Sequence, residues 1–181
     1  MRRQVIFQDE LDCQVFMELL RKEAKENDCA IHAYCFMSNH VHLLIATGSV
    51  ELGKFMKHLA GKYAMYYNHK YAYKGHVFEG RYKSCLVETD EYFLQTSRYI
   101  HLNPVKAKMV AHPEDYQWSS YKTIIRMQDD RITETEKTLS YFGNSGIYGY
   151  REFVENAGRK YAVEEEQIRI GMGEDELWLP W

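Results

Sequence analysis

The sequence predicts an α+β fold in which helices pack on a small antiparallel sheet, followed by a helical C-terminal extension. Apolar residues recur at helical spacing in three long stretches, and two short alternating runs separate the first stretch from the second. With 181 residues, 45% hydrophobic and 27% charged, the chain suits one globular domain with an appendage. We expect the domain to occupy residues 1–124 and the extension residues 125–181.

The first predicted helix starts near Asp9 or Asp12, either of which can serve at its start, and it ends around Asn27 and Asp28. Its expected apolar face consists of Phe7, Leu11, Val15, Phe16, Leu19 and Leu20. The runs "CAIHAYCFM" and "HVHLLIA" follow and read as two strands joined by a turn at Met37-Ser38-Asn39. An antiparallel hairpin therefore forms the centre of the predicted sheet.

Gly48-Ser49 is the expected break and cap before the second helix. One face of that helix is marked by Leu52, Phe55, Met56, Leu59, Tyr63, Tyr66 and Tyr67. A loop rich in Tyr, Lys and Gly follows, and "RYKSCLVE", residues 81–88, reads as a further strand.

A third helix is expected to begin at Thr89, where acidic residues suit the helix dipole. It should end near Asn103, because Pro104 disfavours helical geometry in the residue before it. Beyond it, residues 126–146 read as a linker with short helical pieces and residues 150–170 as a terminal helical pair.

His40 and His42 open the second strand of the hairpin. Residues two apart on a strand point to the same face, so both imidazoles project together while Val41 points into the core. Two adjacent imidazoles form half of a site for a divalent metal. A pair of ordinary surface histidines is the alternative, and for a short His-x-His pattern taken alone it is the more frequent one.

The third helix offers the groups that would complete such a site. Tyr99 and Asn103 are four residues apart and hence share one helix face. An amide oxygen suits Mg²⁺ or Mn²⁺, and a phenol beside the cation is placed to attack a phosphodiester. Alternatively, Tyr99 packs on the sheet and Asn103 caps the helix. Tyr82 is a weaker candidate nucleophile, because it has no ligand neighbour.

The net charge of −3 argues against a nucleic-acid partner, but the distribution of charge argues for one. Seven cationic residues and one acidic residue lie between Lys54 and Lys83, whereas residues 155–181 carry seven acids and three bases. Phosphate contacts are expected from lysine and arginine, and base stacking from aromatic rings: Lys54, Lys57, Lys62, Arg81 and Lys83, and Tyr71, Tyr73 and His76. In the alternative reading, the tyrosines pack in the protein and the lysines serve solubility.

The sequence contains no stretch of 18 apolar residues, and its four cysteines form no Cys-x-x-Cys pair. We therefore expect free thiols in a cytoplasmic protein that makes no use of a membrane.

Four ordered blocks resemble one family: "AYCFMSNHVHLLI", "GHVFEGRYKS", "DEYFLQTSRYIHLNPVKAKMV" and "PEDYQWSSY". They are similar to the single-tyrosine HUH transposases, specifically the REP-associated tyrosine transposases, from about Arg3 to Tyr121. The resemblance implies a ferredoxin-like domain of the HUH endonuclease type, in which His40 and His42 hold a metal, Tyr99 is the nucleophile and Asn103 is a metal ligand. It also implies cleavage of single-stranded DNA beside a hairpin through a 5′-phosphotyrosine link, which places the protein at the nucleoid when it is bound to DNA.

The resemblance also implies that the first strand of the family is missing, because "MRRQVIFQDE" is similar to the block that follows that strand. An incomplete sheet exposes a strand edge, and such an edge favours pairing with a second copy of the chain as a homodimer.

Three functions remain open. The first is a metal-dependent DNA nickase and strand transferase. The second is a catalytically weak or inactive, transposase-derived protein that binds DNA hairpins. The third is a metal phosphoesterase that uses activated water and does not need Tyr99.

Overall fold

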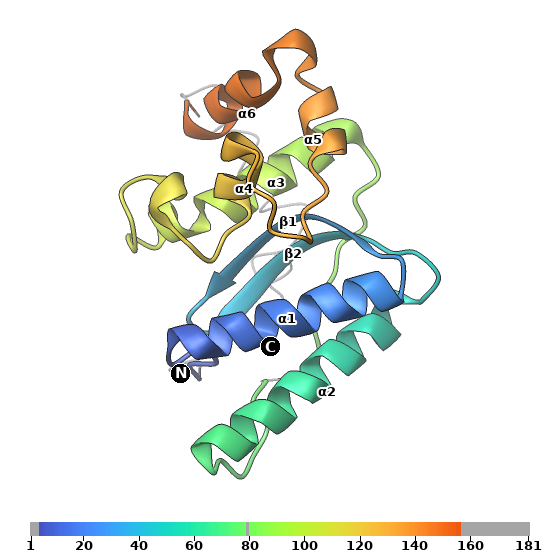
Figure 1. Cartoon of the computed structure of the whole chain (residues 1–181), viewed down its shortest axis with the longest axis vertical. Helices are drawn as coiled ribbons and strands as arrows, with labels where there is room; N and C mark the ends of the chain where they lie inside the picture. Colours follow the sequence, from blue (N-terminus) through green and yellow to red (C-terminus); the bar gives the residue numbers. More distant parts are fainter. Residues whose placement is uncertain (1–3, 79, 157–181) are drawn as a thin grey trace.

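The computed structural model describes residues 4–78 and 80–156. Two strands form an antiparallel sheet, β1 (Ala30–Met37) and β2 (His40–Ala46). The remaining elements are helical: α1 (Glu10–Glu26), α2 (Leu52–Tyr71), α3 (Asp90–Lys106), η1 (Pro113–Asp115), α4 (Tyr121–Arg126), α5 (Glu136–Ser140), η2 (Gly143–Ser145) and α6 (Gly146–Glu155). Helices α1 and α2 cover one side of the sheet, and α3 with the later helices lies on the other side (Figure 1). The α+β class is confirmed, whereas the ferredoxin-like arrangement stays a prediction.

Helix α1 begins where Asp9 and Asp12 predicted its start, and the two residues form a capping box. The Asp9 carboxylate accepts from the Asp12 backbone N–H at 3.1 Å, and the Asp12 carboxylate accepts from the Asp9 backbone N–H at 3.2 Å. The buried face of α1 differs from the predicted one, because Leu11 is 50% exposed whereas Asp12 and Glu23 are buried. Both carboxylates face α2, where Lys70 and Lys62 respectively neutralise them.

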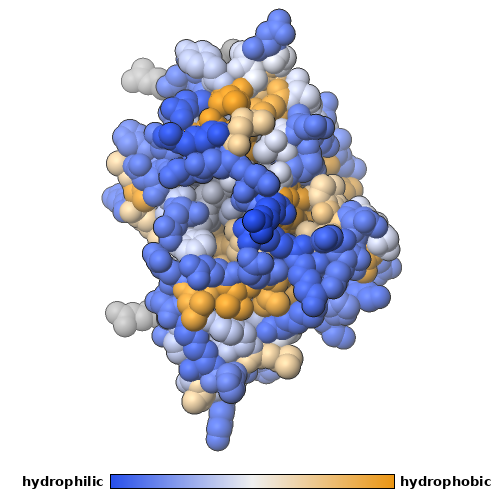
Figure 2. All heavy atoms as spheres, in the orientation of Figure 1, coloured by the Kyte–Doolittle hydropathy of each residue, from blue (hydrophilic) through white to orange (hydrophobic). Residues whose placement is uncertain are grey.

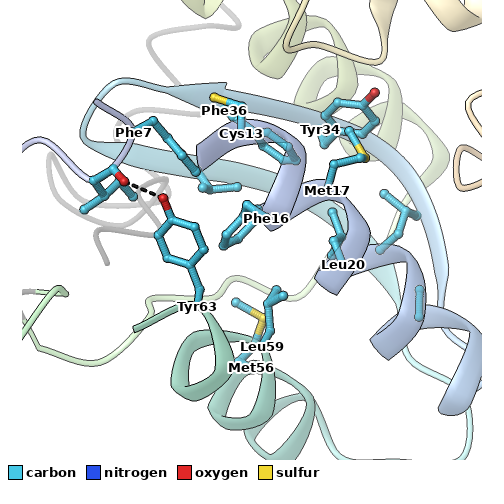
Figure 3. Close-up of a cluster of buried hydrophobic side chains, with 14 of the residues drawn as sticks. Phe7, Cys13, Phe16, Met17, Leu20, Tyr34, Phe36, Met56, Leu59 and Tyr63 are labelled. Atoms are coloured by element: carbon cyan, nitrogen blue, oxygen red, sulfur yellow. Dashed lines mark hydrogen bonds between the residues drawn. The ribbon is translucent and has the colours of Figure 1, made fainter. Parts of the chain in front are cut away.

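The main core lies between α1, α2 and the sheet. Phe16 contacts Phe7, Phe36 and Tyr63, with ring centroids 5.1–5.4 Å apart in edge-to-face geometry. Figure 3 shows these rings together, with the Tyr63 hydroxyl donating to the Ile6 carbonyl at 2.5 Å. The aromatic contacts fasten α1 and α2 to the same face of β1.

Both predicted strands of the hairpin are confirmed. His40 is paired with Met37 and His42 with Cys35, and the register shifts at a bulge between Ile31 and Ala33. The outer edge of β1 is covered by later chain, since the Phe36 N–H donates to the Trp118 carbonyl at 2.9 Å. The connection out of β2 uses Gly48 for its lack of a side chain, because a Cβ there would lie 2.1 Å from a backbone oxygen.

The predicted strand over residues 81–88 is wrong. In the described chain this stretch forms no ladder, and a cavity of about 470 Å³ separates it from β2. A strand is stabilised by hydrogen bonds to a neighbouring strand, and an alternating pattern of side chains does not provide that neighbour. Leu86, expected on one face of that strand, is 77% exposed.

Two predicted helix ends also need correction. Helix α2 has Glu51 as its N-cap instead of Ser49, whose hydroxyl donates to the Asn27 carbonyl at 3.3 Å. Helix α3 starts at Thr89 as expected, but it passes through Pro104 and ends at Lys106. Pro104 is buried, and the helix continues past it, since the Ala107 N–H donates to the Asn103 carbonyl.

The described part of the C-terminal extension packs on α3. Its apolar cluster contains Tyr121, Ile124, Ile125, Tyr150 and Val154. Helix α4 runs across the expected boundary at residue 124, and α5 and η2 are the short helical pieces expected between residues 126 and 146. Helix α6 corresponds to the first member of the predicted helical pair, and the second member lies outside the described residues.

Among the described residues, no helix is both long enough and apolar enough to cross a membrane. Figure 2 shows a mostly hydrophilic face on which apolar residues form separate patches.

Candidate active site

The two histidines of β2 meet on the side of the sheet that packs against α3. Their Nε2 atoms are 3.0 Å apart and their ring planes are nearly perpendicular, at 89°. His40 is 5% exposed and His42 2% exposed, so neither is an ordinary surface histidine. The alternation of β2 places Leu44 on the same face, where it packs in the apolar cluster that includes Phe93 and Ile100 of α3.

Asn39 in the hairpin turn orients the first histidine. Its Oδ1 lies 2.6 Å from Nδ1 of His40. An amide oxygen only accepts, so Nδ1 of His40 carries the hydrogen and, in the neutral ring, the lone pair of Nε2 faces His42. Metal-binding histidines are oriented in this way, by a carbonyl that accepts from the nitrogen that does not bind the metal.

The spacing of the two Nε2 atoms fits a divalent cation. Two nitrogens each about 2.1 Å from a metal and at right angles around it lie about 3.0 Å apart. The same 3.0 Å separation serves as a hydrogen bond between the neutral rings. Residues 4–78 and 80–156 contain no cluster of three or more His, Cys, Asp and Glu side chains suited to a metal.

Tyr99 lies against this pair. Its ring centroid is 5.9 Å from that of His42, and the planes meet at 89°. On the other side, Nζ of Lys106 lies 4.8 Å from the Tyr99 ring centroid, so a positive charge accompanies the phenol. The tertiary fold thus brings Tyr99 of α3 and His42 of β2 together.

Asn103 is buried one turn after Tyr99, and its Nδ2 donates to the Tyr99 carbonyl at 2.9 Å. The bond fixes the orientation of the amide, and Oδ1 is the atom suited to a cation. Asn103 does not cap the helix end as the alternative expected, because α3 continues to Lys106 and its C-cap is Ala107. The role of Asn103 as a metal ligand stays a prediction.

The cavity beside β2 adjoins the histidine pair. Its lining includes His42, Thr96 and Ile100 together with the chain from Lys83 to Asp90. Tyr82, the weaker candidate nucleophile, lies elsewhere: its hydroxyl would be 3.4 Å from a Cβ at Gly53 in the first turn of α2. That contact places the Tyr82 side chain against the first turn of α2.

The predicted DNA-binding residues fall into two groups. Side chains on the surface are Lys54, Lys57, Tyr73, His76 and Arg81, with Lys83 half-buried at the cavity. The other two bind acidic residues of α1, although the Lys62 side chain is itself 41% exposed. Lys62 pairs with the buried Glu23, and the Tyr71 hydroxyl donates to Asp12 at 2.8 Å.

Three contributors to this region were not predicted: Asn39, Lys106 and a buried polar network behind α3 that joins Ser97, His101, Ser120 and Tyr150. Asn39 directly precedes His40, which is a signal that could have been used. The residue spacing of Lys106, seven positions after Tyr99, also places it on the same helix face. The network behind α3 joins distant segments and has no local signal.

Residues 1–103 match the family model described as "Transposase IS200 like", which is more than half of the 181 residues. The match ends at Asn103 and so includes His40, His42 and Tyr99. No curated protein and no solved structure matches the chain.

Proposed function

Because this chain belongs to the IS200-like transposase family, we propose that it is a metal-dependent single-stranded DNA endonuclease and strand transferase of the single-tyrosine HUH type. We assign it to the REP-associated group, with DNA hairpins as its substrates. The observation that carries the proposal is the meeting of three side chains: His40 and His42 face each other at 3.0 Å, and the Tyr99 ring adjoins His42.

In the proposed reaction, the Tyr99 hydroxyl attacks the phosphorus of a phosphodiester in single-stranded DNA. A bond forms between Tyr99 Oη and phosphorus, and the bond from phosphorus to the 3′ oxygen breaks. The phenol loses a proton and the departing 3′ oxygen gains one. Since one phosphoester replaces another, the free 3′-hydroxyl can reverse the attack and join a different strand without ATP.

His40, His42 and Asn103 are the residues proposed to hold Mg²⁺ or Mn²⁺. The cation supplies Lewis-acid polarisation of a phosphoryl oxygen. The protein's own part is to fix the ligand atoms in advance, through Asn39 for His40 and through the Tyr99 carbonyl for Asn103.

DNA is proposed to bind along the first turns of α2 and the adjoining chain. Lys54, Lys57 and Arg81 are exposed, and the side chain of Tyr82, the residue after Arg81, lies against the first turn of α2. Such a row of cations suits the phosphate backbone, and the exposed Tyr73 and His76 suit stacking with unpaired bases. Lys62 and Tyr71 have a smaller part in this surface because both bind acidic residues of α1.

A DNA-hairpin-binding protein without turnover is the second candidate. The two-stranded sheet of the described chain favours it, since a small sheet holds β2 and its histidines less firmly than a larger one.

One experiment separates these functions. The protein is incubated with a labelled single-stranded hairpin oligonucleotide and Mg²⁺ or Mn²⁺, and a covalent adduct is sought on a denaturing gel. Adduct that is lost in Tyr99→Phe, but kept in the control Tyr82→Phe, supports the proposal. Cleavage that survives Tyr99→Phe supports a phosphoesterase that uses water, and binding without cleavage supports the second candidate.

A further inference from the structure

A buried network of side-chain hydrogen bonds lies on the side of α3 that faces away from Tyr99. Ser97 and His101 are four residues apart on one face, and both are fully buried. Tyr150 of α6, also fully buried, places its hydroxyl 2.6 Å from Ser97 Oγ and 2.7 Å from His101 Nδ1. One hydroxyl of the C-terminal extension thus contacts two consecutive turns of α3.

The network continues into the sheet. His101 Nε2 lies 2.8 Å from Ser120 Oγ, and Ser120 Oγ accepts from the Tyr34 backbone N–H of β1 at 2.9 Å. Burial lowers the pKa of His101 to about 3, so the ring is neutral and donates through one nitrogen while accepting through the other. The hydroxyls of Tyr150 and Ser120 can each donate or accept, so either ring nitrogen of His101 can carry the hydrogen. The result is a continuous connection from α6 through α3 to the sheet that carries His40 and His42.

The two faces of α3 are linked by helix geometry. Tyr99 and Asn103 follow Ser97 and His101 by two residues each, which is about 200° around the helix. Fixing the buried face against Tyr150 and Ser120 therefore fixes the direction in which Tyr99 points. A rotation of α3 by about 10° moves a group about 6 Å from the helix axis by about 1 Å, which is enough to disturb an in-line attack.

A second contact holds the start of the same helix. The Tyr141 hydroxyl donates to Asp90 Oδ1 at 2.6 Å, and its ring lies 5.8 Å from that of Phe93. The extension therefore holds α3 both at its first turn and at Ser97 and His101. Residues 141 and 150 lie beyond the part of the chain that matches the family model.

We propose that Tyr150 is a positioning residue for the reaction of Tyr99: through Ser97 and His101 it sets the rotation of α3, so that the C-terminal extension is part of the catalytic apparatus. The inference rests on the proposed function, since it presumes that Tyr99 is the nucleophile. It assigns the extension a role in the rate of attack and none in the binding of DNA.

The test compares Tyr150→Phe with Tyr148→Phe in the full-length chain. Tyr150→Phe removes the hydroxyl and keeps the ring, which packs 5.6 Å from Phe142. Tyr148 is on the same helix, 66% exposed, and its hydroxyl donates to Glu152 at 3.0 Å, so it controls for loss of a phenol from α6. The rate of adduct formation at saturating hairpin oligonucleotide and the oligonucleotide concentration for half-saturation are both measured, at a temperature where circular dichroism shows the variants folded.

We expect Tyr150→Phe to lower the saturated rate by about 10- to 100-fold with an unchanged half-saturation concentration, and Tyr148→Phe to change neither. Ser97→Ala, which removes one of the two partners of the hydroxyl, should lower the rate in the same direction by less, and it decides the matter if Tyr150→Phe does not fold. Equal saturated rates in Tyr150→Phe, Ser97→Ala and Tyr148→Phe would overturn the positioning role while leaving Tyr99 as nucleophile. Wild-type protein that forms no adduct would instead overturn the proposed function, and the positioning role with it.

Discussion

Nε2 of His40 and Nε2 of His42 lie 3.0 Å apart on the face of β2 that packs against α3. The lone pair of His40 Nε2 points at its neighbour because Asn39 binds the hydrogen on Nδ1. We propose that these two buried imidazoles act as a pair of metal ligands.

Metal binding should depend on both rings. We expect His40→Ala and His42→Ala each to weaken Mn²⁺ binding by more than about 10-fold, since the loss of even an orienting partner of a ligand costs that much. Isothermal titration calorimetry measures the affinity. The control is His112→Ala, which changes an exposed histidine. Unaltered Mn²⁺ affinity in both β2 variants would show that the pair is only a hydrogen bond.

DNA binding should weaken with salt, and its slope should report the exposed lysines of α2. Each phosphate contact to a single strand contributes about 0.7 to the slope of log affinity against log salt concentration. Lys54→Ala and Lys57→Ala should each lower the slope by about that amount in fluorescence anisotropy with a hairpin oligonucleotide. Lys122→Ala, an exposed lysine of α4, should leave it unchanged. A slope near zero for the wild type would contradict the electrostatic part of the proposal.

His101 should make the stability depend on pH. Its folded pKa is about 3, below the ordinary value of 6.5, because burial disfavours the charged ring. Between these two pH values the unfolded chain binds a proton at His101 that the folded chain does not bind. The contribution of the neutral ring to the free energy of unfolding is therefore fully present above pH 6.5 and is lost as the pH falls toward 3. In that window the unfolding free energy should fall by about 1.4 kcal/mol per pH unit from this group.

Urea unfolding of the wild type, His101→Gln and His112→Gln between pH 7 and pH 4 measures this dependence. The His101 variant should show the smaller pH dependence, and the variant of the exposed His112 should follow the wild type. Identical pH profiles for all three proteins would contradict a neutral, buried His101.

Phe16 holds the core between α1, α2 and the sheet. It is 1% exposed and contacts three aromatic rings, so Phe16→Ala should lower the free energy of unfolding by about 3–5 kcal/mol. Leu11→Ala on the same helix changes a residue that is 50% exposed and should cost less than about 0.5 kcal/mol. Similar losses of unfolding free energy for the two substitutions, measured by urea unfolding, would contradict the assignment of Phe16 to the core.

The edge of β2 that faces the cavity should allow association at high concentration. We expect light scattering to show a mass that rises from monomer toward dimer as the protein is concentrated. Leu86→Lys adds a charge at the cavity and should shift the equilibrium toward monomer, whereas Met65→Lys, on an exposed part of α2, should not. A monomer at every concentration would contradict the expected homodimer.

Local sequence was sufficient for the elements whose signals are local. The hairpin follows from alternation on both sides of a short turn, the start of α1 from Asp9 and Asp12, and the start of α3 from Thr89. The shared orientation of His40 and His42 needed only the two-residue period of a strand, and the spacing of Tyr99 and Asn103 only the helical turn. Residues 81–88 show the limit of such patterns, because a strand requires a partner that its own residues do not encode.

By itself, the sequence determined the α+β class, the hairpin with its two histidines, the helix with Tyr99, and the resemblance to a transposase family. Only the tertiary structure decided that Tyr99 adjoins His42, that Lys62 and Tyr71 bind acidic residues of α1, and that Tyr150 holds the far side of α3. The physical reason is the range of the interactions. Periodicity and capping act over one or two turns, whereas these contacts join residues 39 to 59 positions apart, whose partners are set by how the helices pack on the sheet.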